Sequence, residues 1–109
     1  MFSIPELEAR HGGVPKITQV DALIDMLAAT DIPFEVTTNQ GHPQVWYPNS
    51  DTPVCDAICH WGSYGHQDGL IEMVGLTHNG DMVEGYLMAE EVFNRIKENW
   101  EETSEKNLR

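Results

Sequence analysis

The sequence predicts a single α+β domain, an antiparallel sheet of four or five strands with two main helices packed on one face. Three observations lead to this fold class. The chain has 109 residues, the usual length of one domain. Apolar residues recur at helical spacing in two segments, residues 18–28 and 89–102. Between them lie short segments rich in β-branched and aromatic residues, which are separated by turn residues.

The N-terminal part is expected to form two helices. Residues 1–16 are an extension with a short helix over residues 3–10. A firmer helix is predicted after Thr18, a capping residue, and it must end before Pro33 because proline removes a backbone donor. Its apolar stripe consists of Val20, Leu23, Ile24 and Leu27.

The predicted strands are, in order, residues 34–38, 44–47, 54–61, 70–74 and 82–87. The third is ambiguous, because Thr52 and Pro53 could also begin a short helix that ends at Gly62. We favour a strand, since residues 62–69 resemble a hairpin loop that leads directly into the next strand.

The last helix is predicted over residues 89–102, followed by a frayed tail at 103–109. Glu90 and Glu91 lie in its first turn, where the helix dipole favours negative charge. The apolar residues Val92, Phe93, Ile96 and Trp100 form one stripe, which is typical of a face buried in the core.

The charge balance narrows the choice of partners. Eighteen acids face six bases, for a net charge of −12, and no Lys or Arg lies between Lys16 and Arg95. A phosphate backbone or an anionic membrane needs cations, so we expect no direct nucleic-acid binding and no membrane binding. The acidity serves solubility, or it forms a face that binds a basic protein partner.

The compartment is predicted to be the cytoplasm. The N-terminus has no basic start followed by an apolar stretch, so it does not resemble a secretory signal. No apolar run is long enough for a membrane span. Two cysteines do not make a disulfide framework, which favours a reducing environment.

Residues 55–76 hold the densest group of chemically capable side chains. Cys55, Cys59, His60 and His66 suggest a zinc site, but their spacing matches no standard one. On a strand the two sulfurs would lie about 13 Å apart, too far for one ion or a disulfide. A metal therefore requires a helix here, or a site across strands such as His60 with Glu72, and we predict no cofactor. A small metal-binding protein remains an alternative.

An enzyme is the second alternative. Cys59 with His60 or His66 has the residue types of a thiolate–imidazole pair, but strand neighbours point to opposite faces. Acid–base chemistry by His60 and Glu72, with Asp56 beside them, is open as well. Because no complete constellation is present, no catalytic residue is predicted.

Binding is the favoured class. On a strand, Asp56 and His60 share the wet face, near Glu72, while Cys55, Ala57, Cys59 and Trp61 form the buried one. The hairpin loop adds four further candidates: Ser63, Tyr64, His66 and Asp68. The alternative is that these loop residues only bond to local backbone and that Tyr64 folds back on the sheet.

Several segments resemble a family of small proteins from bacteriophages, prophages and Gram-positive or gut bacteria that carries no established activity. The matching residues are Cys55-Asp56, Cys59-His60, Ser63-Tyr64-Gly65-His66, Gly69-Leu70-Ile71-Glu72-Met73 and Gly75-Leu76. The resemblance extends over residues 20–100 and implies an accessory role in a bacterial or phage cytoplasm. Met88 departs from it, because a helix-capping Thr would be expected there.

Together these observations predict a small acidic accessory protein that acts by non-catalytic protein binding. Inhibition of a basic host protein is one concrete form of that function. The sequence leaves open whether the chain forms a homo-oligomer.

Overall fold

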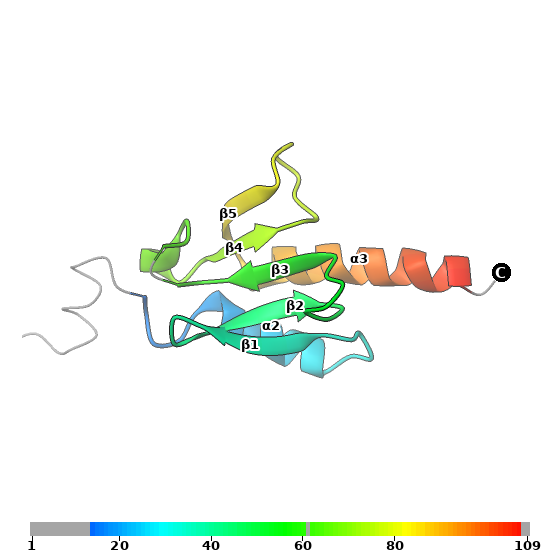
Figure 1. The fold of residues 1–109 in the computed structure, drawn as a ribbon, viewed down its shortest axis with the longest axis horizontal. Helices are drawn as coiled ribbons and strands as arrows, with labels where there is room; N and C mark the ends of the chain where they lie inside the picture. The colour runs from blue at the N-terminus through cyan, green and yellow to red at the C-terminus, as the bar shows by residue number, and fades with distance from the viewer. Residues whose placement is uncertain (1–13, 61, 108–109) are drawn as a thin grey trace, which may run out of the picture.

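The computed structural model describes residues 14–60 and 62–107. The elements, in chain order, are α2 (Gln19–Ala28), β1 (Glu35–Asn39), β2 (His42–Tyr47), β3 (Cys55–Ile58), the 3₁₀ turn η1 (His66–Asp68), β4 (Ile71–Val74), β5 (Val83–Leu87) and α3 (Ala89–Asn107). The five strands form one sheet in the order β1-β2-β3-β4-β5, with every neighbouring pair antiparallel. Both helices lie on the same side of this sheet (Figure 1), which confirms the predicted α+β class.

The start of α2 follows directly from its sequence. The Thr18 side-chain oxygen accepts a hydrogen bond from the Val20 N–H at 3.1 Å, and Asp21 accepts one from the Thr18 N–H at 2.8 Å. This capping box satisfies two backbone donors that have no partner within the helix. The predicted stripe then buries Val20, Leu23 and Leu27 against the sheet.

Helix α3 begins without a side-chain cap from the residue before it, because Met88 has no side-chain oxygen. The amide oxygen of Gln19 instead accepts the Ala89 N–H at 2.9 Å, so the start of α2 caps the start of α3. The helix continues to Asn107, beyond the predicted end at Glu102. Residues 103–107 are therefore helical, where the sequence predicted a frayed tail.

The core lies between the sheet and the helices. Val45, Ala57 and Met73 are directly opposed across β2, β3 and β4, and all three are buried. Side chains from α2 and α3 pack on this row and exclude water from it. Ile58 is also buried, yet it does not belong to this core cluster, because strand alternation turns it to the opposite face.

Strand β3 is shorter than the predicted residues 54–61. It ends at Ile58 because the Ser63 hydroxyl accepts the His60 N–H at 3.0 Å and donates to the His60 carbonyl at 2.9 Å. These two bonds turn the chain two residues after the strand ends.

Trp61 and the predicted helix over residues 3–10 lie outside the described residues. In the described ranges, no helix has the length and apolar character needed to span a bilayer.

Candidate functional site

One face of the sheet is covered by neither α2 nor α3, and we call it the open face (Figure 1). Directly opposed residues on neighbouring strands project from the same face. The open face therefore carries two adjacent rows of side chains. One row contains Trp46, Asp56, Val74 and Val83, and the other contains Thr37, Gln44, Ile58 and Glu72.

Hydrogen bonds between side chains order part of this face. The Gln44 amide donates to an Asp56 carboxylate oxygen at 3.1 Å, and the Gln44 carbonyl oxygen accepts from Asn39 at 3.2 Å. The Trp46 indole N–H donates to the Thr37 hydroxyl at 2.7 Å. The indole ring and the Asp56 carboxylate are thus each held in place from a neighbouring strand.

A hollow of about 270 Å³ opens beside Asp56, and we call it the Asp56 hollow. Its walls are mostly apolar, and its lining residues are Trp46, Pro53, Val54, Cys55, Asp56, Val74, Gly75 and Met82. Gly75 has a φ of +84°, and a Cβ atom there would collide with the Val54 carbonyl oxygen. Only glycine allows the two backbones to approach this closely, so Gly75 shapes one wall of the hollow.

Asp56 is half-buried in this apolar surrounding. Burial raises the pKa of its carboxyl group, and the nearby Glu72 carboxylate adds to the increase. Hydrogen bonds from Gln44 and from the Val74 backbone oppose the shift in pKa without cancelling it. The two ion pairs among the described residues, Arg95–Glu84 and Lys97–Glu101, do not involve Asp56. The hollow therefore contains a carboxylate that lacks a cation from these residues.

The loop that follows β3 forms a second hollow, of about 360 Å³, which we call the Tyr64 hollow. It is lined by residues 62–68 together with Tyr86 of β5. The Tyr64 N–H donates to Glu72 at 2.7 Å, and the Tyr64 carbonyl accepts from the Tyr86 N–H at 3.5 Å. These bonds tie the loop to β4 and β5, while 63% of Tyr64 stays exposed.

Tyr86 occupies an unusual backbone conformation. Its φ is +61°, in the left-handed region that costs a non-glycine residue roughly 1–2 kcal/mol. The strand pairing is irregular at the same place, since Ile71 pairs with Leu87 but Met73 pairs with Glu84. The bulge places an aromatic side chain, 65% exposed, against the loop. Strain of this kind clusters at functional sites.

The predicted loop candidates take different roles. Ser63 is 2% exposed and holds the turn after β3, so its hydroxyl is engaged within the fold. His66 lies in η1, and its Nδ1 is 2.7 Å from the Ser63 carbonyl. Asp68 is exposed at the end of the same turn. These positions support the alternative of local backbone bonding for Ser63, whereas Tyr64 presents its ring to solvent.

The structure separates His60 from the strand that carries Asp56. Asp56 and Glu72 occupy adjacent rows of the open face, as strand alternation predicts for Asp56. His60 lies beyond the end of β3, where its Nδ1 accepts the Gly62 N–H at 3.1 Å. The expected face shared by Asp56 and His60 is therefore interrupted by the turn at Ser63.

The two thiols sit in surroundings that suppress their reactivity. Cys55 and Cys59 are free and buried. Burial, with a smaller effect of Asp56, raises the pKa of Cys55 to about 12. Burial, with a smaller effect of Asp21, raises the pKa of Cys59 to about 11. Both therefore stay protonated near neutral pH, which favours neither nucleophilic attack nor metal binding.

A metal site does not assemble from the predicted ligands. Within residues 14–60 and 62–107, no three His, Cys, Asp or Glu side chains are arranged so that they could hold an ion. The Cys59 sulfur instead lies 3.8 Å from the His66 carbonyl oxygen. The residue types that suggested zinc are thus used for packing and for local turns.

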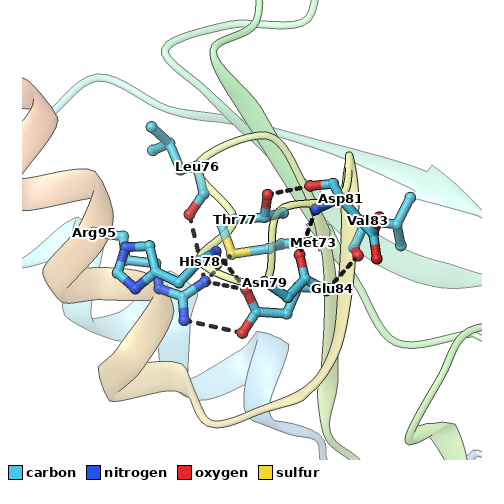
Figure 2. A network of polar contacts seen from close by, with 9 residues as sticks. All are labelled: Met73, Leu76, Thr77, His78, Asn79, Asp81, Val83, Glu84 and Arg95. Atoms are coloured by element: carbon cyan, nitrogen blue, oxygen red, sulfur yellow. Dashed lines mark hydrogen bonds and ion pairs between the residues drawn. The ribbon is translucent and has the colours of Figure 1, made fainter.

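Sequence reasoning missed a partly buried ion pair that joins the β4–β5 hairpin to α3. Arg95 of α3 makes two hydrogen bonds to Glu84 of β5, at 3.0 and 3.1 Å (Figure 2). The His78 N–H also donates to Glu84, at 2.7 Å, and Arg95 contacts the Leu76 carbonyl at 3.4 Å. These bonds lower the pKa of Glu84 to about 2, with the Arg95 hydrogen bonds as the largest cause. The only signal in the sequence was the isolated Arg95 itself.

The predicted candidates Asp56, Ser63, Tyr64, His66 and Asp68 do line the two hollows, but four other wall residues were missed. Trp46, Val54, Met82 and Tyr86 come from β2, the loop before β3, the β4–β5 turn and β5. Nothing in their local sequence indicates that they meet, since the sheet pairing brings them together.

Comparisons with known proteins add no assignment. The chain matches no protein-family model, no curated protein sequence and no solved structure. The resemblance to small phage and bacterial proteins therefore stays a prediction from the residues.

Proposed function

We propose that this protein is a non-catalytic protein-binding module whose contact surface consists of the open face and the loop at residues 62–69. One observation carries the proposal. Five of the eight exposed large apolar side chains in the described residues line the two hollows, namely Val54, Tyr64, Val74, Met82 and Tyr86. Apolar side chains gathered beside polar groups are typical of protein interaction sites.

The chemistry of the polar groups also favours binding over catalysis. The thiols are buried and protonated, so they are poor nucleophiles. The Nδ1 atoms of His60 and His66 each contact a backbone atom of their own turn. Exposed aromatic rings and a half-buried carboxylate supply contact area and polarity without supplying a reaction centre.

We further propose that the partner is a basic protein. The net charge of −12 creates a field that speeds encounter with a positive surface and disfavours acidic ones. Following the resemblance to phage and bacterial proteins, we propose that this encounter occurs in a bacterial cytoplasm, with inhibition of a basic host protein as one form of the function. A second copy of the chain would carry the same negative charge, which opposes self-association through this surface.

The test is partner capture with variants of the loop. Tyr64→Ala and His66→Ala are each expected to reduce recovery of the partner at least roughly tenfold, as loss of an interface anchor does. Val36→Ala is the matched control, because Val36 is exposed but lines neither hollow. The melting temperature of Tyr64→Ala should stay close to that of the wild type, since the ring is mostly exposed. Normal capture by both loop variants would show that the loop is not the contact surface.

A further inference from the structure

We propose that the Asp56 hollow receives a single basic side chain, an arginine or a lysine, from the protein partner. The aliphatic stem would lie along the apolar walls, and its positive charge would pair with the Asp56 carboxylate. This inference rests on the proposed protein-binding function and specifies the chemistry that one part of its surface recognises.

The walls suit the stem of such a side chain. Val54, Val74 and Met82 are 42%, 37% and 79% exposed, so their apolar surface is available to an incoming group. Lys and Arg bury their methylene stems against surfaces of this kind while the charged end reaches a polar group. The volume of about 270 Å³ falls just below the range of pockets for drug-sized ligands, which fits one side chain better than a large molecule.

Trp46 adds a feature that favours a cation. Its indole N–H is bonded to the Thr37 hydroxyl at 2.7 Å, which fixes the position of the ring beside the hollow. A guanidinium or ammonium group over an indole ring is attracted by the negative face of the aromatic system. A fixed ring loses no rotamer freedom when the cation arrives, so the contact costs less to form.

Asp56 supplies the charge. A carboxylate offers about four sites for accepting hydrogen bonds, and Gln44 and the Val74 backbone N–H use only part of that capacity. Its surroundings add negative charge through Glu72, and neither ion pair of the described residues satisfies it. An anionic occupant would be repelled, and a neutral apolar one would bury the carboxylate without a positive charge beside it. A cation is the occupant that removes this penalty.

The inference can be tested on the full-length protein with single-residue probes. We would titrate it with N-acetyl-arginine amide and N-acetyl-lysine amide and follow the Trp46 indole N–H and the Val74 amide by NMR. N-acetyl-norleucine amide is the neutral control, because it has an apolar stem without the charge. At least one basic amide should bind saturably with a Kd on the order of 1 mM, as expected for so small a ligand. The neutral amide should bind at least tenfold more weakly.

Two substitutions localise the probe. Asp56→Asn keeps the shape of the side chain and should weaken binding of the basic amide at least tenfold, whereas Asp51→Asn, at an exposed acid outside the hollow, should not change it. Val74→Lys places an ammonium group directly opposite Asp56 on the neighbouring strand and should block the probe by occupying the hollow. Val36→Lys is its control, because Val36 is exposed on β1, two strands away from Asp56, and pairs with Val45, whose side chain is on the buried face.

The possible outcomes separate this inference from the proposed function. Equal binding of basic and neutral amides, undiminished binding by Asp56→Asn, or no saturable shift would each overturn the inference. If Tyr64→Ala still reduced partner capture in that case, the protein-binding function would stand without it. If the basic amide bound at Asp56 but no variant altered partner capture, the chemistry of the hollow would stand and the assignment to a protein partner would be wrong.

Discussion

Two carboxylates on opposite faces of the sheet have contrasting environments. Glu84 faces the helices, accepts two hydrogen bonds from Arg95 and has a pKa lowered to about 2. Asp56 lies on the open face, is half-buried among apolar side chains and has a raised pKa. The fold stabilises the charge of Glu84 and penalises the charge of Asp56.

The difference in pKa indicates different roles for the Glu84 and Asp56 carboxylates. Glu84 joins β5 to α3, so its charge serves the architecture. Asp56 gains less from its fixed neighbours than it loses by leaving water, so its charge costs the folded state free energy. Proteins tolerate such costs where a group must meet something outside the fold. This comparison is why we propose Asp56, and not Glu84, as the carboxylate that meets a partner.

Arg95→Met should give the largest effect on stability. It keeps an apolar stem but leaves Glu84, 17% exposed, without its cation. We expect a loss of about 2–3 kcal/mol in the free energy of unfolding, somewhat below the cost of breaking a fully buried pair. Denaturant unfolding measures it, with Lys97→Met as the control, because Lys97 belongs to an exposed pair on the same helix. A loss for Arg95→Met no larger than that of the control would contradict a structural role for the pair.

The pH dependence of the free energy of unfolding should show the contribution of the Glu84 charge, which is the second largest effect. Its pKa is depressed in the folded state, so its contribution to stability is complete above the unfolded pKa near 4.5. That contribution should disappear as the pH falls from about 4.5 to about 2. Glu84→Gln should make the free energy of unfolding less dependent on pH in this window. Glu101→Gln, at an exposed acid, should leave that dependence unchanged. Identical acid limbs for wild type and Glu84→Gln would refute the assignment.

Asp56→Asn should raise the free energy of unfolding at neutral pH, whereas the changes at Arg95 and Glu84 lower it. Because the folded pKa of Asp56 is raised, its penalty is absent below the unfolded pKa and grows as the pH rises through the folded pKa. The variant should therefore be more stable than the wild type at pH 7, and the two should become equally stable in acid. Thermal unfolding of the variant and the wild type, at pH 7 and in acid, measures the difference in stability. A variant that is less stable at neutral pH would show that the carboxylate serves the fold.

The smallest effect is expected at Tyr86. Tyr86→Gly removes the strain of a positive φ but increases the freedom of the unfolded chain, so we expect a net gain of about 0.5 kcal/mol. Partner capture should nevertheless fall, because the ring lines the Tyr64 hollow. Gly41→Tyr is the converse control, because Gly41 has a positive φ in an open turn. This substitution should destabilise the folded protein, since it forces a tyrosine into that conformation. Unchanged capture by Tyr86→Gly would remove Tyr86 from the contact surface.

Local signals predicted the fold. Thr18 identified the start of α2, apolar periodicity identified both main helices, and strand alternation assigned Asp56 and Cys55 to opposite faces. These features depend on residues a few positions apart, which is the range over which sequence patterns carry structural information.

Long-range contacts shaped the candidate site, and the sequence did not reveal them. Gln19 caps Ala89 across 70 positions, and Arg95 pairs with Glu84 across an element boundary. Ser63 ends β3 early and removes His60 from the strand, because one hydroxyl satisfies two backbone groups of His60. The Asp56 hollow combines three strands or their flanking loops, so its walls become visible only once the pairing is known.

The most direct test of the central claim is quantitative partner capture from the native host's lysate, at low and moderate salt, with four forms of the full-length protein. These are the wild type, Tyr64→Ala, Asp56→Asn and the control Asp51→Asn. We expect one basic protein to be recovered near stoichiometry by the wild type and the control, less of it at moderate salt, and little of it by the other two variants. Equal recovery by all four forms, or recovery that does not respond to salt, would contradict binding of a basic partner through the open face and its loop.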